Sequence, residues 1–173
     1  GQFTAMSIVN TQNNTKIVKV RFLEGKNSRE VLDFNLFMSP NDVWTGAVVA
    51  TADGAKVISN DNSCVAPSDL FAETRRDGLG VQFLSEFKNY EYTGNSATGT
   101  VDNPTMASLD RTREGYFEVI EMSVIDDDLV TGNAMTAGNT APTVTAFIKH
   151  NSAGVPANCP AVDGFDGNSP AAT

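Results

Sequence analysis

Two acidic segments contain the residues of this sequence that are best suited to binding a cation. Asp126, Asp127 and Asp128 form a continuous carboxylate run, and Asp163 and Asp166 are each followed by a glycine. Hard cations such as Ca²⁺ take several oxygen ligands from flexible loops, so both segments are candidate calcium sites. Neither segment matches the EF-hand pattern, which ends in Glu, and a solvated acidic turn is the alternative for each.

Trp44 is the only tryptophan in the chain and is a candidate platform for stacking on a sugar ring. Tyr90, Tyr92 and Tyr116 could contribute further aromatic faces to such a site. The alternative is that Trp44 fills the core or lies at its rim, because large aromatic side chains dominate core packing.

Motifs of nucleophilic, phosphate-binding and metal-dependent enzymes are absent from the sequence. His150 is the only histidine, and we interpret it as a surface residue rather than as part of a Ser-His-Asp arrangement. Glu118 and Glu121 are an odd number of residues apart in an expected strand, so they point to opposite faces and cannot form a facing catalytic pair. The sequence therefore predicts a protein that is not an enzyme. The alternative is a glycoside hydrolase or lyase whose carboxylates, such as Glu73, Glu86, Glu114 and Glu118, meet in space in a way that sequence spacing does not show.

Glu121 is expected on the same strand face as Phe117 and Val119. A carboxylate on an inward face is unfavourable unless it is paired with a cation, so we expect an Arg or Lys partner at the end of the strand. A ligand or metal site at the sheet edge is the alternative. The candidate partners are Arg75, Arg76, Arg111 and Arg113.

The two cysteines, Cys64 and Cys159, lie in loop-like contexts and belong to no CxxC motif. One histidine is too few to complete a zinc set, and the sequence around Cys64 lacks the basic neighbours of a reactive thiol. We therefore predict a Cys64–Cys159 disulfide. Such a bond indicates an oxidising compartment, which is the periplasm, the cell surface or the medium.

The chain of 173 residues has a formal net charge of −9 and a pI of about 4.4, which argues against a nucleic-acid partner. No segment is long and apolar enough to predict a transmembrane helix. The chain opens Gly1-Gln2-Phe3 without a methionine, which predicts a processed or trimmed form.

Apolar and polar residues alternate over 16–38, with a polar, glycine-containing turn in the middle, and this pattern predicts a β-hairpin. Further strands are predicted at 3–10, 43–50, 55–59 and 115–124. The remaining predictions are a loop with one possible helical turn at 60–78, an exposed loop at 94–105, and either a strand or a short helix at 143–151.

These elements predict an all-β fold, an antiparallel β-sandwich of Ig-like or jelly-roll type with one or two short helices. We expect a single domain over 1–173, with an irregular tail from about 151 to 173. The residues expected to share the core are Val18, Val20, Phe22, Leu32, Phe34, Leu36, Phe117 and Val119.

Several strings in the chain carry a resemblance to a known family: 7–11, 18–36, 39–44, 115–122 and 154–159. They resemble an uncharacterised family of secreted β-sandwich proteins from Gram-negative bacteria. The resemblance implies export to the cell surface or the medium. It implies no enzymatic role, so no residue acquires a catalytic function from it.

The expected function is that of a non-enzymatic extracellular structural module, a cell-surface or self-assembling subunit of a filament or layer. Sheet edges can join such subunits by strand addition, and divalent cations would favour association of an acidic chain. The alternative is a carbohydrate- or calcium-dependent binding module, which would use Trp44, a glycan partner and the acidic loops.

Overall fold

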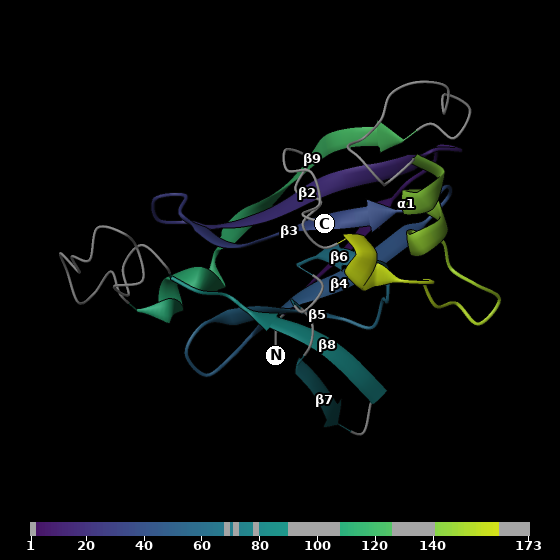
Figure 1. Cartoon of the computed structure of the whole chain (residues 1–173). Helices are drawn as coiled ribbons and strands as arrows, with labels where there is room; N and C mark the ends of the chain where they lie inside the picture. Colours follow the sequence, from purple (N-terminus) through teal and green to yellow (C-terminus); the bar gives the residue numbers. More distant parts are fainter. Residues whose placement is uncertain are drawn as a thin grey trace.

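The computed structural model describes residues 3–67, 70, 73–77, 80–89, 108–125 and 141–162. These residues form strands in two sheets, together with one short α-helix and two 3-10 turns (Figure 1). All described strand pairs are antiparallel, which confirms the predicted all-β sandwich class.

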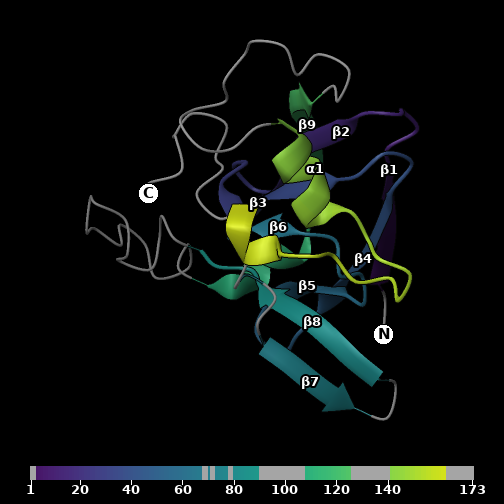
Figure 2. The same ribbon diagram turned by 45° about the vertical axis from the view of Figure 1, so that its right-hand side comes forward.

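The larger sheet has five strands in the order β1-β4-β5-β8-β7, and the smaller sheet has four in the order β6-β3-β2-β9. The larger sheet contains β1 (Phe3–Val9), β4 (Val43–Ala50), β5 (Ala55–Ser59), β8 (Gly80–Glu86) and β7 (Glu73–Asp77). The smaller sheet contains β6 (Val65–Ala66), β3 (Glu30–Met38), β2 (Thr15–Glu24) and β9 (Gly115–Ile125). Figure 2 shows β8 and β7 extending the larger sheet away from the smaller one, with β1 at the opposite margin.

β2 and β3 form the predicted hairpin. Val20 lies opposite Phe34, and Phe22 lies opposite Leu32, so the alternating apolar side chains of both strands lie on the same face of the sheet. These four side chains are buried against the larger sheet. The hairpin thus supplies one wall of the main core.

The main core lies between the two sheets. Trp44 from β4 packs against Phe34 from β3 with ring centroids 5.9 Å apart, and each residue is 1% exposed. Met6 from β1 and Val57 from β5 complete the wall contributed by the larger sheet. Burial of each large apolar side chain contributes about 1.5–3 kcal/mol, so this layer is the main source of stability.

A second apolar cluster covers part of the outer face of the smaller sheet. Ile17 and Phe37 point away from the main core and contact Val144 and Ile148 of α1 (Ala141–Ile148). The short 3-10 turn η3 (Cys159–Val162) closes the same cluster. Of the two alternatives for 143–151, the helix is therefore correct. Within the described ranges, no helix is long and apolar enough to cross a membrane.

The prediction that Phe117 and Val119 are buried in the core is wrong. Both residues are more than 40% exposed, although the Phe117 ring lies 6.0 Å from that of Phe22. The reason is position, because β9 is the last strand of the smaller sheet in the described part of the chain and only β2 flanks it.

The region 60–78, predicted as a loop, contains the strands β6 and β7, and β8 follows directly. β6 has only two residues and is defined by its pairing with β3, while β7 is defined by its pairing with β8. Strands of this kind arise from tertiary pairing and have little periodicity of their own. The predicted exposed loop at 94–105 lies outside the described residues.

Candidate functional site

β9 presents large apolar side chains on both of its faces. Phe117 and Val119 lie on the face directed toward the larger sheet, and Tyr116 and Ile120 lie on the other face. All four are between 41% and 46% exposed. A long, apolar strand at the edge of a sheet is a template for pairing with another strand.

The register of β9 shows which of its backbone groups point away from β2. The Gly25 N–H donates a hydrogen bond to the Glu114 carbonyl at 2.8 Å, so this pair is of the hydrogen-bonded type. Hydrogen-bonded and non-hydrogen-bonded pairs alternate along an antiparallel ladder. The N–H and C=O groups of Phe117 and Val119 therefore point outward, and no described strand pairs with that side of β9.

The two glutamates of β9 form ion pairs with cations from β2. Glu118 lies 3.5 Å from Arg21, and Glu121 lies 2.7 Å from Lys16. The expectation that Glu121 finds a basic partner is confirmed, although the partner is Lys16. The arginines named as candidates were Arg75, Arg76, Arg111 and Arg113. Exposed ion pairs add little stability, but these two reduce the negative charge of the edge, with Arg21 shared between Glu118 and Glu30, which lies 2.7 Å away.

β1 is a second open edge on the same side of the sandwich. Its seven residues include no charged residue and no proline. Thr4 of β1 and Phe117 of β9 both line a cavity of about 110 Å³ between the sheets, together with Phe22 and Phe87. This cavity is smaller than the roughly 150 Å³ that holds a benzene molecule, so it suits one inserted side chain better than a substrate.

The other two edges have features that discourage pairing. β6 consists of two residues and is followed by Pro67, which has no N–H to donate. β7 has five residues with the largely charged sequence Glu73-Thr-Arg-Arg-Asp77. Short, charged or proline-flanked edges are the usual protection against edge-to-edge association. In the described part of the chain, β1 and β9 lack this protection.

A buried ion pair joins the turn between β2 and β3 to the segment that leads into β9. The Glu24 carboxylate is fully buried and accepts hydrogen bonds from the N–H groups of Lys26, Asn27 and Arg29, and from the Arg111 guanidinium at 3.2 Å. Burial raises the pKa of Glu24, but these hydrogen bonds outweigh it and hold the pKa below its ordinary value. Arg111 belongs to η1 (Leu109–Arg113), directly before β9, so the pair ties the start of β9 to the hairpin.

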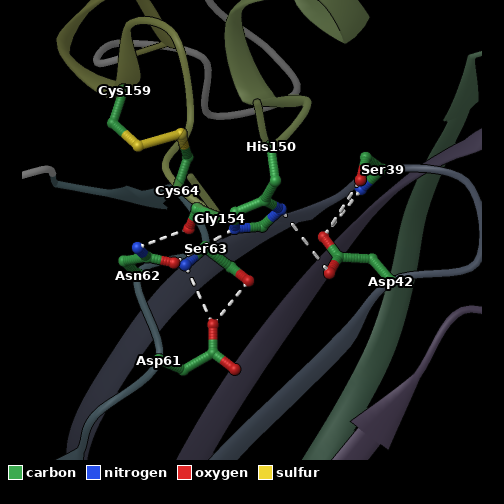
Figure 3. The surroundings of a disulfide bond; sticks show 9 residues. All are labelled: Ser39, Asp42, Asp61, Asn62, Ser63, Cys64, His150, Gly154 and Cys159. Atoms are coloured by element: carbon green, nitrogen blue, oxygen red, sulfur yellow. Dashed lines mark hydrogen bonds and ion pairs between the residues drawn. A yellow bond between two sulfur atoms is a disulfide. The ribbon is translucent and has the colours of Figure 1, made fainter. Parts of the chain in front are cut away.

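The predicted disulfide between Cys64 and Cys159 is confirmed (Figure 3). It joins the segment after β5 to η3, at the edge of the second apolar cluster. His150 lies nearby, with Nε2 3.2 Å from Asn62 Oδ1 and Nδ1 3.9 Å from Asp42. Because Ser39 donates its own hydrogen bond to Asp42, these groups link three loops and do not form a nucleophile–base–acid chain.

The structure overturns the hypothesis that Trp44 stacks on a ligand. The indole is 1% exposed and packs on Phe34, so neither of its faces is available to a sugar. Tyr116 is exposed, and Tyr90 and Tyr92 lie outside the described residues.

The candidate calcium residues all lie outside the described residues. They are Asp126, Asp127, Asp128, Asp163 and Asp166. Among the described residues, no group of three or more His, Cys, Asp or Glu side chains is placed to hold a metal ion.

Sequence reasoning did not identify the open edge of β9 as a site. The available signal was that β9 has apolar residues at both odd and even positions, which an ordinary half-buried strand does not have. Such a strand is either covered on both faces within the chain or exposed to a partner. Comparison of the chain with protein-family models, with curated proteins and with solved structures finds no match.

Proposed function

We propose that this chain is an exported, non-enzymatic structural module that associates with copies of itself through its open sheet edge. The observation that carries the proposal is β9, an eleven-residue edge strand with half-exposed apolar side chains on both faces. Pairing of such an edge with another strand would satisfy outward backbone groups and cover apolar surface in one step.

The charge distribution favours a second copy as the partner. With a net charge of −9, the chain is expected to repel copies of itself over most of its surface. The negative charge is lower at this edge, because Glu121 is paired with Lys16, Glu118 shares Arg21 with Glu30, and β1 has no charge. Two copies that meet at this side therefore experience less repulsion between like charges than they would elsewhere.

Export is supported by the disulfide. Structural disulfides form and persist in oxidising compartments and are rare in the cytosol. The Cys64–Cys159 bond joins residues 95 positions apart and closes the second apolar cluster. A module with this covalent link is suited to conditions outside the cell.

The test is multi-angle light scattering over a concentration series. We expect the unmodified chain to form dimers or larger species as its concentration rises. Val119→Lys places a charge at the open edge and should shift the association to at least tenfold higher concentration, a change of about 1.4 kcal/mol. A chain that stays monomeric at every concentration overturns the proposal.

Val155→Lys is the matched control. Val155 is 47% exposed, close to the 41% of Val119, but it lies in the 151–156 segment and not in a strand. The same change in charge there should leave association unaffected. Equal effects of the two substitutions would show that net charge, rather than the β9 edge, controls association.

A further inference from the structure

We propose that the strand which pairs with β9 is β9 of a second copy, antiparallel and related by a two-fold axis at Phe117. This inference rests on the proposed function, because it specifies how self-association occurs. Homodimers with a two-fold axis are the commonest assemblies, and an edge strand meets itself antiparallel when that axis is normal to the sheet. The two smaller sheets would then join into one continuous sheet.

The orientation of the β9 backbone N–H and C=O groups restricts the registers in which two copies of β9 can pair. Outward N–H and C=O groups belong to the odd-numbered residues from Gly115 to Glu121, as the hydrogen bond from Gly25 to Glu114 indicates. An axis normal to the sheet keeps each side chain on its own face, so odd residues must pair with odd residues. The axis therefore passes through a residue of β9 and not between two residues.

Two of these registers are unfavourable, one because of the charge of Glu118 and one because of the irregular strand pairing at Met122. An axis at Glu118 places that carboxylate directly opposite its own copy, which is unfavourable. The pairing of β2 with β9 is irregular at Met122, where the register shifts, so an axis at Val119 would bring this irregular position into the central contact. An axis at Phe117 avoids both problems.

The Phe117 register also produces favourable neighbours. The two Phe117 rings meet across the axis, and Val119 of each copy lies opposite Gly115 of the other. On the other face, Tyr116 lies opposite Glu118. Aromatic pairs across antiparallel strands stabilise the pairing, and no carboxylate lies directly opposite another.

Cysteine cross-linking tests this register. The chain has two cysteines and both are in the disulfide, so an introduced cysteine is the only free thiol. Phe117→Cys should form a disulfide-linked dimer under mild oxidation, because the two Cα atoms would lie within the 4.4–6.8 Å range typical of disulfides. Val119→Cys should remain at background, because its two copies would be four residues out of register, about 13 Å apart along the strands.

A second experiment avoids the Phe117 ring, whose removal could disturb packing on Phe22. Tyr116→Cys chains and Glu118→Cys chains change only the outer face, and their mixture should cross-link more than either variant alone. A higher yield with Val119→Cys than with Phe117→Cys, or no excess in the mixture, overturns the inference. If the cross-linking fails but light scattering still detects dimers of the unmodified chain, the proposed self-association stands and only the Phe117 register is wrong. If light scattering detects only monomers, both the self-association and the register are wrong.

Discussion

β3 and β9 belong to the same sheet and have similar apolar content, but their surroundings are opposite. Phe34 and Phe37 point to different faces of β3, and both are fully buried, one under the larger sheet and one under α1. Phe117 and Ile120 also point to different faces of β9, and both are half exposed. Alternation predicts that a segment is a strand, whereas its neighbours decide whether its apolar side chains stabilise the fold or remain available to a partner.

The largest expected effect contrasts the two strands directly. Phe34→Ala should lower the free energy of unfolding by about 3–5 kcal/mol, because it empties a well-packed core position. Phe117→Ala should lower it by only about 1 kcal/mol, because much of that ring is already exposed to water. Urea unfolding of the monomeric chain at low concentration measures both values. Equal losses would show that β9 is part of the core after all.

The connection that carries the chain into β9 depends on Glu24. Glu24→Gln should cost about 3 kcal/mol at neutral pH, the lower end for breaking a buried ion pair, because the buried Arg111 would face a neutral amide. Urea unfolding at neutral pH measures this loss. A loss below 1 kcal/mol would indicate that η1 holds the start of β9 without this pair.

The same residue gives a pH dependence with a defined sign. The pKa of Glu24 is lower in the folded chain than in the unfolded chain. Its contribution to stability is therefore complete above the unfolded-state pKa of about 4.3 and is lost as the pH falls through the folded-state pKa. The difference in unfolding free energy between the unmodified chain and Glu24→Gln should shrink in acid, and a difference independent of pH would contradict this assignment.

Removal of the disulfide should expose apolar surface on β3, as apolar surface is already exposed on β9. Replacing Cys64 and Cys159 with serine should lower the free energy of unfolding by about 2–4 kcal/mol, because the long loop between them is no longer closed in the unfolded chain. It should also loosen the cover over Phe37, which increases binding of a dye specific for exposed apolar surface. Unchanged dye binding would mean that packing of α1 alone holds the cover in place.

The sequence was sufficient for the elements whose burial follows from local alternation. The hairpin of β2 and β3 follows from a period-two pattern, and the strands β1, β4, β5 and β9 follow from apolar runs bounded by turn residues. The disulfide follows from the lack of any other role for two cysteines. β6 and β7 were missed because they owe their conformation to the strands beside them. The open edge was missed because burial of Phe117 and Val119 depends on sheet order, which local alternation does not contain.

The pairing of β2 with β9 has a consequence for the order of folding. Arg21 reaches Glu30 across 9 residues but reaches Glu118 across 97, so the hairpin can form early, and β9 must join by a slow, non-local step. Until then β2 itself is an unpaired edge. Its cations Lys16, Lys19 and Arg21 are the type of residue that keeps an edge from aggregating. We expect these cations first to protect the nascent sheet from aggregation, and we expect two of them, Lys16 and Arg21, later to pair with the glutamates of the strand that completes it.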